Sequence, residues 1–205
     1  MHNLGVGGDL AYSALSRLPR VVALRPDVVV VAVGWNDILT TVFPNARRFI
    51  GAWKRLPSDP SPAWCGANLR TIVREVHART GARVGLVSPS DMGENPQSSD
   101  PVQRELNGLF ADYRDIVEQI AHEEGAGYLP FYERLHEQIV AEPGQDFTAF
   151  RFWAMYGNAV RQYLLRQSLD EIARRNGWRF HVDGLHLNRR GGMVLAEVVQ
   201  QFLDA

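Results

Sequence analysis

Continuous runs of apolar residues, rather than alternating ones, mark three short stretches of the chain. They are Val28 to Val33, Arg83 to Val87 and Gly127 to Leu129. Continuous apolarity is typical of strands that are covered on both faces, as in a parallel sheet. We therefore expect three buried strands of a mainly parallel sheet.

Apolar residues spaced three or four positions apart predict helices in the stretches around these runs. Strands that alternate with helices predict a three-layer α/β fold, and 205 residues fit a single domain over residues 1–205. The first expected helix is capped by Asp9 and ends near Pro19. The others cover Asn68 to Gly81, Leu106 to Gly125, about Asn158 to Asn176, and Gly192 to Leu203.

Two stretches that contain several prolines predict loops. Residues 56–66 predict a surface loop that holds Cys65, the only cysteine, which we interpret as an inert thiol. One cysteine forms no internal disulfide, which is compatible with a cytoplasmic location. Residues 88–101 leave the carboxyl end of the second strand, the edge at which α/β proteins place their sites.

The net charge and the lengths of the apolar runs argue against nucleic-acid and membrane partners. The formal net charge is −1, so no bulk field favours nucleic acid or an anionic membrane. No apolar run is long enough to span a bilayer, and no signal peptide is visible. We expect a cytoplasmic protein with a small-molecule ligand, no nucleic-acid partner and no membrane span.

One candidate motif is Asp183-Gly184-Leu185-His186-Leu187, just before the last predicted helix. An Asp three residues before a His can fold back to accept the imidazole Nδ1–H, which leaves Nε2 free as a base. Alone the pattern is weak, because a capping Asp beside a surface His has the same spacing.

A second motif, Gly34-Trp35-Asn36-Asp37, directly follows the first predicted strand. It places an amide at the carboxyl end of a strand, where its NH2 group can donate to a developing oxyanion. A plain turn, with local hydrogen bonds from Asn36 and Asp37, is the alternative.

A third motif is the glycine-rich stretch Asn3 to Asp9, which opens the first predicted helix. Its backbone N–H groups can hold an anion, as in a nucleotide-binding domain. No Gly-Lys-Ser/Thr follows, however, and a tight turn that needs positive φ explains the glycines equally well.

Together and in this order, the three motifs resemble the SGNH family of serine ester hydrolases, also called GDSL. The resemblance implies a flavodoxin-like sheet, an ester substrate and no cofactor or metal. It also implies that His186 is the base, that Asp183 orients it, and that Gly8 and Asn36 donate to the oxyanion. Trp35 and the loop after Val87 are expected to shape the pocket.

One departure from the family pattern concerns the nucleophile. Members carry Gly-Asp-Ser at the end of the first strand, and here that strand and its serine would lie upstream of Met1. The chain as given is therefore expected to be inactive and poorly stable, and a non-catalytic ligand-binding protein is the alternative. The serines in other contexts are Ser13, Ser16, Ser58, Ser61, Ser88, Ser90, Ser98, Ser99 and Ser168.

The other histidines and an aromatic cluster are expected to have structural rather than catalytic roles. The histidines outside the motif show no metal-binding spacing; His122 and His136 are expected to be exposed on helices, and His181 to be a strand or turn residue. The aromatic cluster is expected to pack in the core, with a pocket wall as the alternative. Its members are Phe147, Phe150, Phe152, Trp153, Met155 and Tyr156.

Overall fold

The computed structural model describes residues 1–151, 157 and 160–205. None of the described helices is both long and apolar enough to cross a membrane. In chain order the elements are α1 (Ala11–Ser16), α2 (Leu18–Ala23), β1 (Val28–Val31), α3 (Trp35–Val42), α4 (Pro44–Lys54), α5 (Pro62–Thr80), β2 (Arg83–Val87), α6 (Pro101–Glu124), β3 (Gly127–Leu129), α7 (Phe131–Ala141), α9 (Leu169–Asn176) and α10 (Arg189–Asp204).

The three predicted strands form one parallel sheet in the order β1-β2-β3. Val30 of β1 lies opposite Gly85 of β2, which in turn lies opposite Gly127 of β3. Among the described residues no strand pairs with the outer edge of β1, and 37% of Val30 is exposed there. β1 ends at Val31, before the end of the apolar run at Val33.

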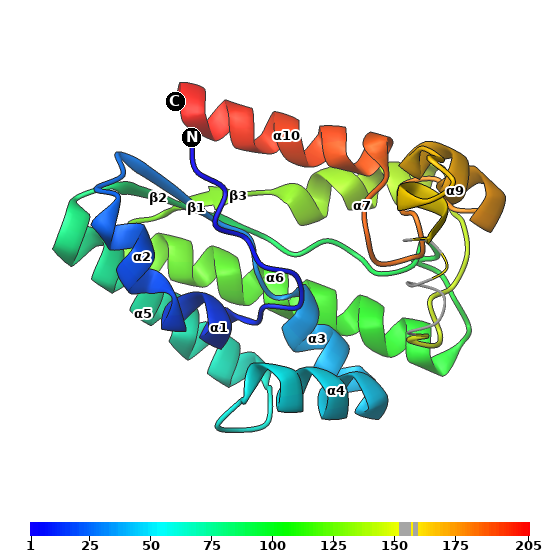
Figure 1. The fold of residues 1–205 in the computed structure, drawn as a ribbon, viewed down its shortest axis with the longest axis horizontal. Coiled ribbons are helices and arrows are strands. Elements are labelled where there is room, and N and C mark those ends of the chain that lie inside the picture. Colours follow the sequence, from blue (N-terminus) through cyan, green and yellow to red (C-terminus); the bar gives the residue numbers. More distant parts are fainter. Residues whose placement is uncertain (152–156, 158–159) are drawn as a thin grey trace.

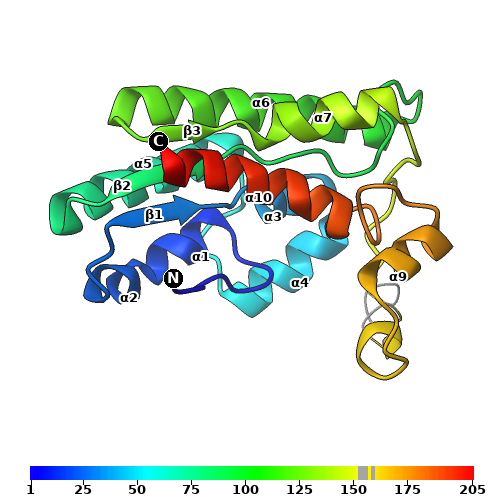
Figure 2. The same cartoon turned by 90° about the horizontal axis from the view of Figure 1, so that it is seen from above.

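Helices cover both faces of the sheet, which confirms the three-layer α/β fold (Figure 1, Figure 2). α5 and α6 pack against each other and against β2, and α1 and α2 pack on α5. α10 lies on the other face, against β3 and α7. Neighbouring residues of β2 serve opposite faces, because Leu86 joins the core beneath α5 and α6 and Val87 joins the core beneath α10.

The face of the sheet beneath α10 carries glycines where the helix comes closest. A Cβ atom on Gly85 would lie 2.7 Å from the Phe202 ring, and one on Gly127 would lie 2.5 Å from it. Because the two glycines are neighbours across β2 and β3, they leave one shared recess for this ring. The recess fixes where α10 lies on the sheet.

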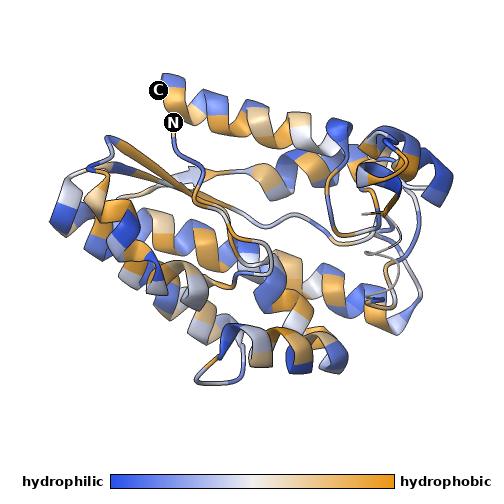
Figure 3. Ribbon diagram, in the orientation of Figure 1, coloured by the Kyte–Doolittle hydropathy of each residue, from blue (hydrophilic) through white to orange (hydrophobic). Residues whose placement is uncertain are grey.

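Hydropathy follows the layers, with α10 turning a hydrophobic side toward the sheet and a hydrophilic side outward (Figure 3). Val194 and Val198 of this helix are buried, whereas Arg190 and Glu197 are exposed. This spacing of apolar residues is the pattern that predicted the helix, and α10 begins at Arg189, slightly before the expected Gly192.

The predicted loop over residues 56–66 is wrong in its second half. α5 begins at Pro62, because the Ser61 side chain accepts a hydrogen bond from the backbone N–H of Trp64 and proline suits the first turn of a helix. Cys65 therefore lies in a helix and is completely buried. Asn68, expected as the cap, lies within the helix.

Other helix boundaries also differ from the prediction, and α6 begins at Pro101, after an Asp100 cap, rather than at Leu106. At the N-terminus, α1 is capped at Leu10 rather than Asp9, and α2 starts separately at Leu18 with Pro19 in its first turn. The helix expected from Asn158 is interrupted before α9, which starts after a Ser168 cap. Residue 158 itself lies outside the described residues.

Candidate active site

A cavity of about 740 Å³ opens where β1 ends and α3 begins. Three stretches that are far apart in the sequence form its wall, namely residues 5–9, residues 32–36 and residues 182–187. The carboxyl end of a parallel strand is the usual place for a site in an α/β fold. Five residues predicted from the sequence line this one cavity: Gly8, Trp35, Asn36, Asp183 and His186.

Asp183 and His186 form a hydrogen-bonded pair at the cavity. The carboxylate of Asp183 lies 3.0 Å and 3.2 Å from Nδ1 of His186, and it also accepts the backbone N–H of His186 at 2.8 Å. The Asp183 side chain is 12% exposed and that of His186 is 56% exposed. The Nδ1–H donates to Asp183, so Nε2 is left available as a base.

The pair shifts the pKa values of both its members. The hydrogen bond from His186 to Asp183 raises the pKa of His186 above its ordinary value, against a smaller opposing effect of burial. Burial alone would raise the pKa of Asp183, but the hydrogen bonds and charge of His186 outweigh it and lower the pKa. Asp183 is therefore ionised at neutral pH and favours a proton on His186.

The glycine-rich stretch ends in a tight turn at Gly8, whose φ is +75°. A Cβ atom there would lie 2.6 Å from the Trp53 ring, so both backbone conformation and space favour glycine. The turn is closed by a hydrogen bond from the Asp9 N–H to the Val6 carbonyl, 3.2 Å away. The turn brings the backbone of Gly8 to the cavity wall.

The Asp9 carboxylate fixes this turn through two basic side chains. It pairs with Lys54 at 2.7 Å and with Arg17. Lys54 also donates to the carbonyl of Gly7 at 2.9 Å, and Arg17 donates to the carbonyl of Leu4 at 2.6 Å. The glycine-rich stretch, which could have bound an external anion, thus already contains the Asp9 carboxylate as the partner of both cations.

The Asn36-Asp37 pair ties α3 to the glycine-rich turn. Asn36 Nδ2 donates to the carbonyl of Asp9 at 3.0 Å, and Asp37 accepts the backbone N–H of Ala11 at 3.1 Å. The plain turn, which was the alternative for this motif, is absent, because Trp35 already starts the first turn of α3. Asp37 is completely buried, and burial raises its pKa to about 7.

Other predicted residues lie away from the cavity. Residues 88–100 form the expected loop, which ends one residue early because Pro101 starts α6, and none of them lines the cavity that this loop was expected to shape. His136 is half-buried rather than exposed, with Nδ1 bonded to Asp91 at 2.8 Å, whereas His122 is exposed as expected. Among the described residues, no His, Cys, Asp and Glu side chains group into a metal site.

The aromatic cluster is described only in part. Phe147 and Phe150 are buried in the larger hydrophobic core, where Phe147 meets Phe43 edge-on. These two residues agree with core packing, although they also line a second cavity, whose wall includes Asp183. The remaining members lie outside the described residues: Phe152, Trp153, Met155 and Tyr156.

One cavity wall thus holds the hydrogen-bonded Asp183–His186 pair, the Gly8 backbone and the Asn36 amide. The chain matches the model of the GDSL-like lipase/acylhydrolase family over residues 1–192. It belongs to that family. As a GDSL-like protein it falls in a class of hydrolases that cleave acyl esters.

Solved structures of esterases share the fold of this GDSL-like chain. An acetylxylan esterase from Geobacillus stearothermophilus is 19% identical, with a TM-score of 0.62 over 97% of this chain and 69% of that one. The acetyl xylan esterase AlAXEase is 17% identical, with a TM-score of 0.58 over 98% of this chain and 78% of that one. No curated protein sequence matches this chain.

One buried pair beside the GDSL-like site escaped the sequence analysis. Glu94 and His181 are fully buried and lie 3.0 Å apart, although they are 87 positions apart in the sequence. His181 is a bridge residue, as the turn-or-strand interpretation expected. Glu94 stands in a polar loop that also carries Asp91, Asn95 and Asp100, and no motif or spacing in the sequence connects it with His181.

Proposed function

We propose that this protein hydrolyses ester bonds in two steps, with His186 as the general base. One observation carries the proposal: the Asp183–His186 pair opens onto the same cavity as Gly8 and Asn36. A base with its orienting acid, facing a backbone donor and an amide donor, is the constellation that acyl transfer requires.

The nucleophile in this proposal is a serine outside residues 1–205. The serine Oγ attacks the ester carbonyl while Nε2 of His186 takes its proton. The N–H of Gly8 and the amide of Asn36 donate to the resulting oxyanion. His186 then protonates the departing alcohol, and water attacks the acyl-enzyme with His186 again as base, which releases the acid and restores the serine. These steps use no cofactor.

A second candidate is a non-catalytic protein that binds an ester or a similar small molecule in the same cavity. It is favoured by one observation, namely that no Ser, Thr or Cys is among the described residues that line the cavity. A nucleotide in the glycine-rich turn is less favoured, because the Asp9 carboxylate already occupies the cations there.

The first test measures hydrolysis of p-nitrophenyl acetate by the product of the complete gene. We expect His186→Ala to lower the rate by roughly 10²–10⁴-fold, the usual contribution of a positioned general base. His122→Ala, at an exposed position of α6, is the matched control and should keep the rate. A parental rate that His186→Ala leaves unchanged would contradict the proposal, and a parent that binds esters without turnover would favour the second candidate.

A further inference from the structure

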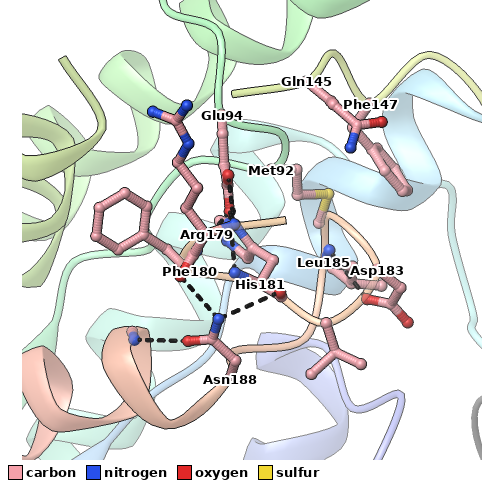
Figure 4. Close-up of polar contacts among 12 residues, drawn as sticks. Met92, Glu94, Gln145, Phe147, Arg179, Phe180, His181, Asp183, Leu185 and Asn188 are labelled. Atoms are coloured by element: carbon pink, nitrogen blue, oxygen red, sulfur yellow. Dashed lines mark hydrogen bonds and ion pairs between the residues drawn. The ribbon is translucent and has the colours of Figure 1, made fainter. Parts of the chain in front are cut away.

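Glu94 is a carboxylate that is completely buried beside the loop that carries Asp183 and His186 (Figure 4). It comes from residues 88–100, which follow β2, and it does not line the cavity. We propose that Glu94 is a positioning residue that holds the Asp183–His186 pair in its working geometry, an inference that rests on the proposed function.

The first support is the set of donors that converge on this carboxylate. Oε1 accepts the backbone N–H groups of Phe180 at 2.7 Å and His181 at 2.9 Å, and it lies 3.0 Å from Nδ1 of His181. Oε2 accepts the backbone N–H of Arg179 at 2.9 Å. Three consecutive backbone groups and a side chain are thereby fixed to one carboxylate.

The second support is the shape of the loop that these groups enter. Residues 180–182 run antiparallel to residues 186–188, with Val182 N–H bonded to the His186 carbonyl at 2.7 Å and Asn188 N–H bonded to the Phe180 carbonyl at 3.0 Å. Asp183 and His186 lie at the tip of this narrow hairpin, and Glu94 is hydrogen-bonded to residues 179–181 at its base. A shift of the base therefore moves both members of the pair.

Asn188 holds the returning side of the hairpin. Its Nδ2 donates to the carbonyl of Arg179 at 2.8 Å, and its Oδ1 accepts the N–H of Gly191 in the first turn of α10. Glu94 and Asn188 thus act on the same residue, Arg179, through its N–H and its carbonyl (Figure 4). The base of the hairpin is fixed from both sides.

The segment around Glu94 also reaches the tip directly. Gly93 N–H donates to the carbonyl of Gly184 at 2.8 Å, between Asp183 and His186 in the sequence. Gln103 of α6 fixes this segment in turn, because its Nε2 donates to the Met92 carbonyl at 2.8 Å. Helix α6 therefore supports the contact that reaches the turn between Asp183 and His186.

Glu94 is held in its ionised form. Burial alone would raise its pKa, but the hydrogen bonds from the His181 side chain and from the backbone of Phe180 and Arg179 lower it below the ordinary value. An ionised carboxylate accepts all these N–H groups at once. A glutamine would turn NH2 hydrogens toward at least one of the donors.

A catalytic role for His181 itself does not fit this geometry. Its side chain is 1% exposed, and neither His181 nor Glu94 lines the described wall of the cavity. His181 therefore acts on the site only through the hairpin backbone, as Glu94 does.

The test measures the pKa of His186 from its imidazole C–H signals in an NMR titration, which needs no turnover. We expect Glu94→Gln to leave a folded protein in which the pKa of His186 falls toward the ordinary 6.5, because Asp183 no longer meets Nδ1 correctly. Glu142→Gln is the matched control, because Glu142 pairs with Arg190 on the surface and should leave this pKa unchanged. A folded Glu94→Gln protein with the parental pKa would overturn the proposal.

His181 provides a second, independent pair of variants should Glu94→Gln fail to fold. His181→Asn keeps a donor near the position of Nδ1 and should retain the raised pKa of His186, whereas His181→Phe removes the donor and should lose it. Equal pKa values of His186 in these two variants would also overturn the proposal.

Activity separates this inference from the proposed function. In the product of the complete gene, Glu94→Gln should lower kcat on the order of 10²-fold with little change in KM, as expected for misplaced catalytic groups. A pKa that falls as expected in a protein without esterase activity would uphold the positioning role and refute the function. A parental kcat in folded Glu94→Gln would refute the positioning role alone.

Discussion

The Nδ2 atom of Asn36 donates a hydrogen bond to the main-chain carbonyl of Asp9, 3.0 Å away. The bond links the first turn of α3 to the turn that carries Gly8, so the two proposed oxyanion donors are fixed relative to each other. Because an amide NH2 has two hydrogens, one is used for this link and the other remains for a substrate. Asn36 is thus both part of the wall and a donor.

We expect Asn36→Ala to lower kcat for p-nitrophenyl acetate by roughly 10²–10³-fold, the usual effect of losing one oxyanion donor. Loss of the bond to Asp9 should also cost about 1 kcal/mol of unfolding free energy, measured in urea. Asn45→Ala is the control, since Asn45 likewise donates to a backbone carbonyl, that of Phe150, but lies outside the cavity wall. Equal kcat values for the two variants would argue against an oxyanion role.

We expect the pH dependence of kcat/KM to report the Asp183–His186 pair. The base works only when neutral, and Asp183 raises its pKa, so the acid limb of the profile should lie above pH 6.5 in the parent. Asp183→Asn should move that limb to lower pH and reduce the plateau. Asp170→Asn, a nearby carboxylate that caps the backbone of Arg189, should leave both unchanged. The same acid limb in the parent and in Asp183→Asn would contradict the assignment.

Asp37 should make the protein less stable as pH rises. Its folded-state pKa of about 7 lies above the ordinary 3.8, so the folded state binds more protons between these values, and the unfolding free energy falls as pH increases through this window. We expect Asp37→Asn to remove the fall, by roughly 4 kcal/mol at most. Urea titrations at pH 4 and pH 8 check this, with exposed Asp112→Asn as control. An unchanged difference between the two pH values would show that Asp37 is not the cause.

The recess for Phe202 predicts a sharp difference between two glycines. A methyl group on Gly127 would meet the ring at 2.5 Å, so we expect Gly127→Ala to lower the unfolding free energy by roughly 1–3 kcal/mol. Gly108→Ala is the control, because it lies in α6 with no atom within 4 Å of the added carbon and should be stabilised by about 1 kcal/mol. Adding Phe202→Leu to Gly127→Ala should recover part of the loss. Similar stabilities of the two single variants in urea would contradict this account.

The sequence predicted those parts of the fold that depend on local pattern. All three strands and their parallel arrangement follow from short apolar runs, and α6 ends at Gly125 as expected. The pattern failed at Ser61, where prolines predicted a loop but the side chain caps a helix, so that α5 starts at Pro62. It also missed α3, α4 and α7, and α7 starts at Phe131 directly after Pro130, since a proline at the end of a strand can equally stand at the start of a helix.

The candidate site could be predicted where its chemistry lies within one short motif. Asp183 and His186 are three positions apart, and their hydrogen bond follows from that spacing. Glu94 and His181 meet only because the loop after β2 and the hairpin of Asp183 and His186 fold together, which no local pattern encodes. The surroundings of His136 escaped for the same reason, since its partner Asp91 belongs to that same loop.

The contacts of Glu94 also bring together two parts of the chain that are more than thirty positions apart, residues 144–145 and Arg179. Its backbone bonds to Gly144 and Gln145, and its side chain bonds to Arg179, so the chain leaves and returns at one buried residue. The two ends of residues 145–179 are therefore joined at one buried residue, and Asn176 near the second end also donates to the carbonyl of Val182 at 2.9 Å. A change of sequence within this stretch that spares these contacts should leave the hairpin of Asp183 and His186 in place.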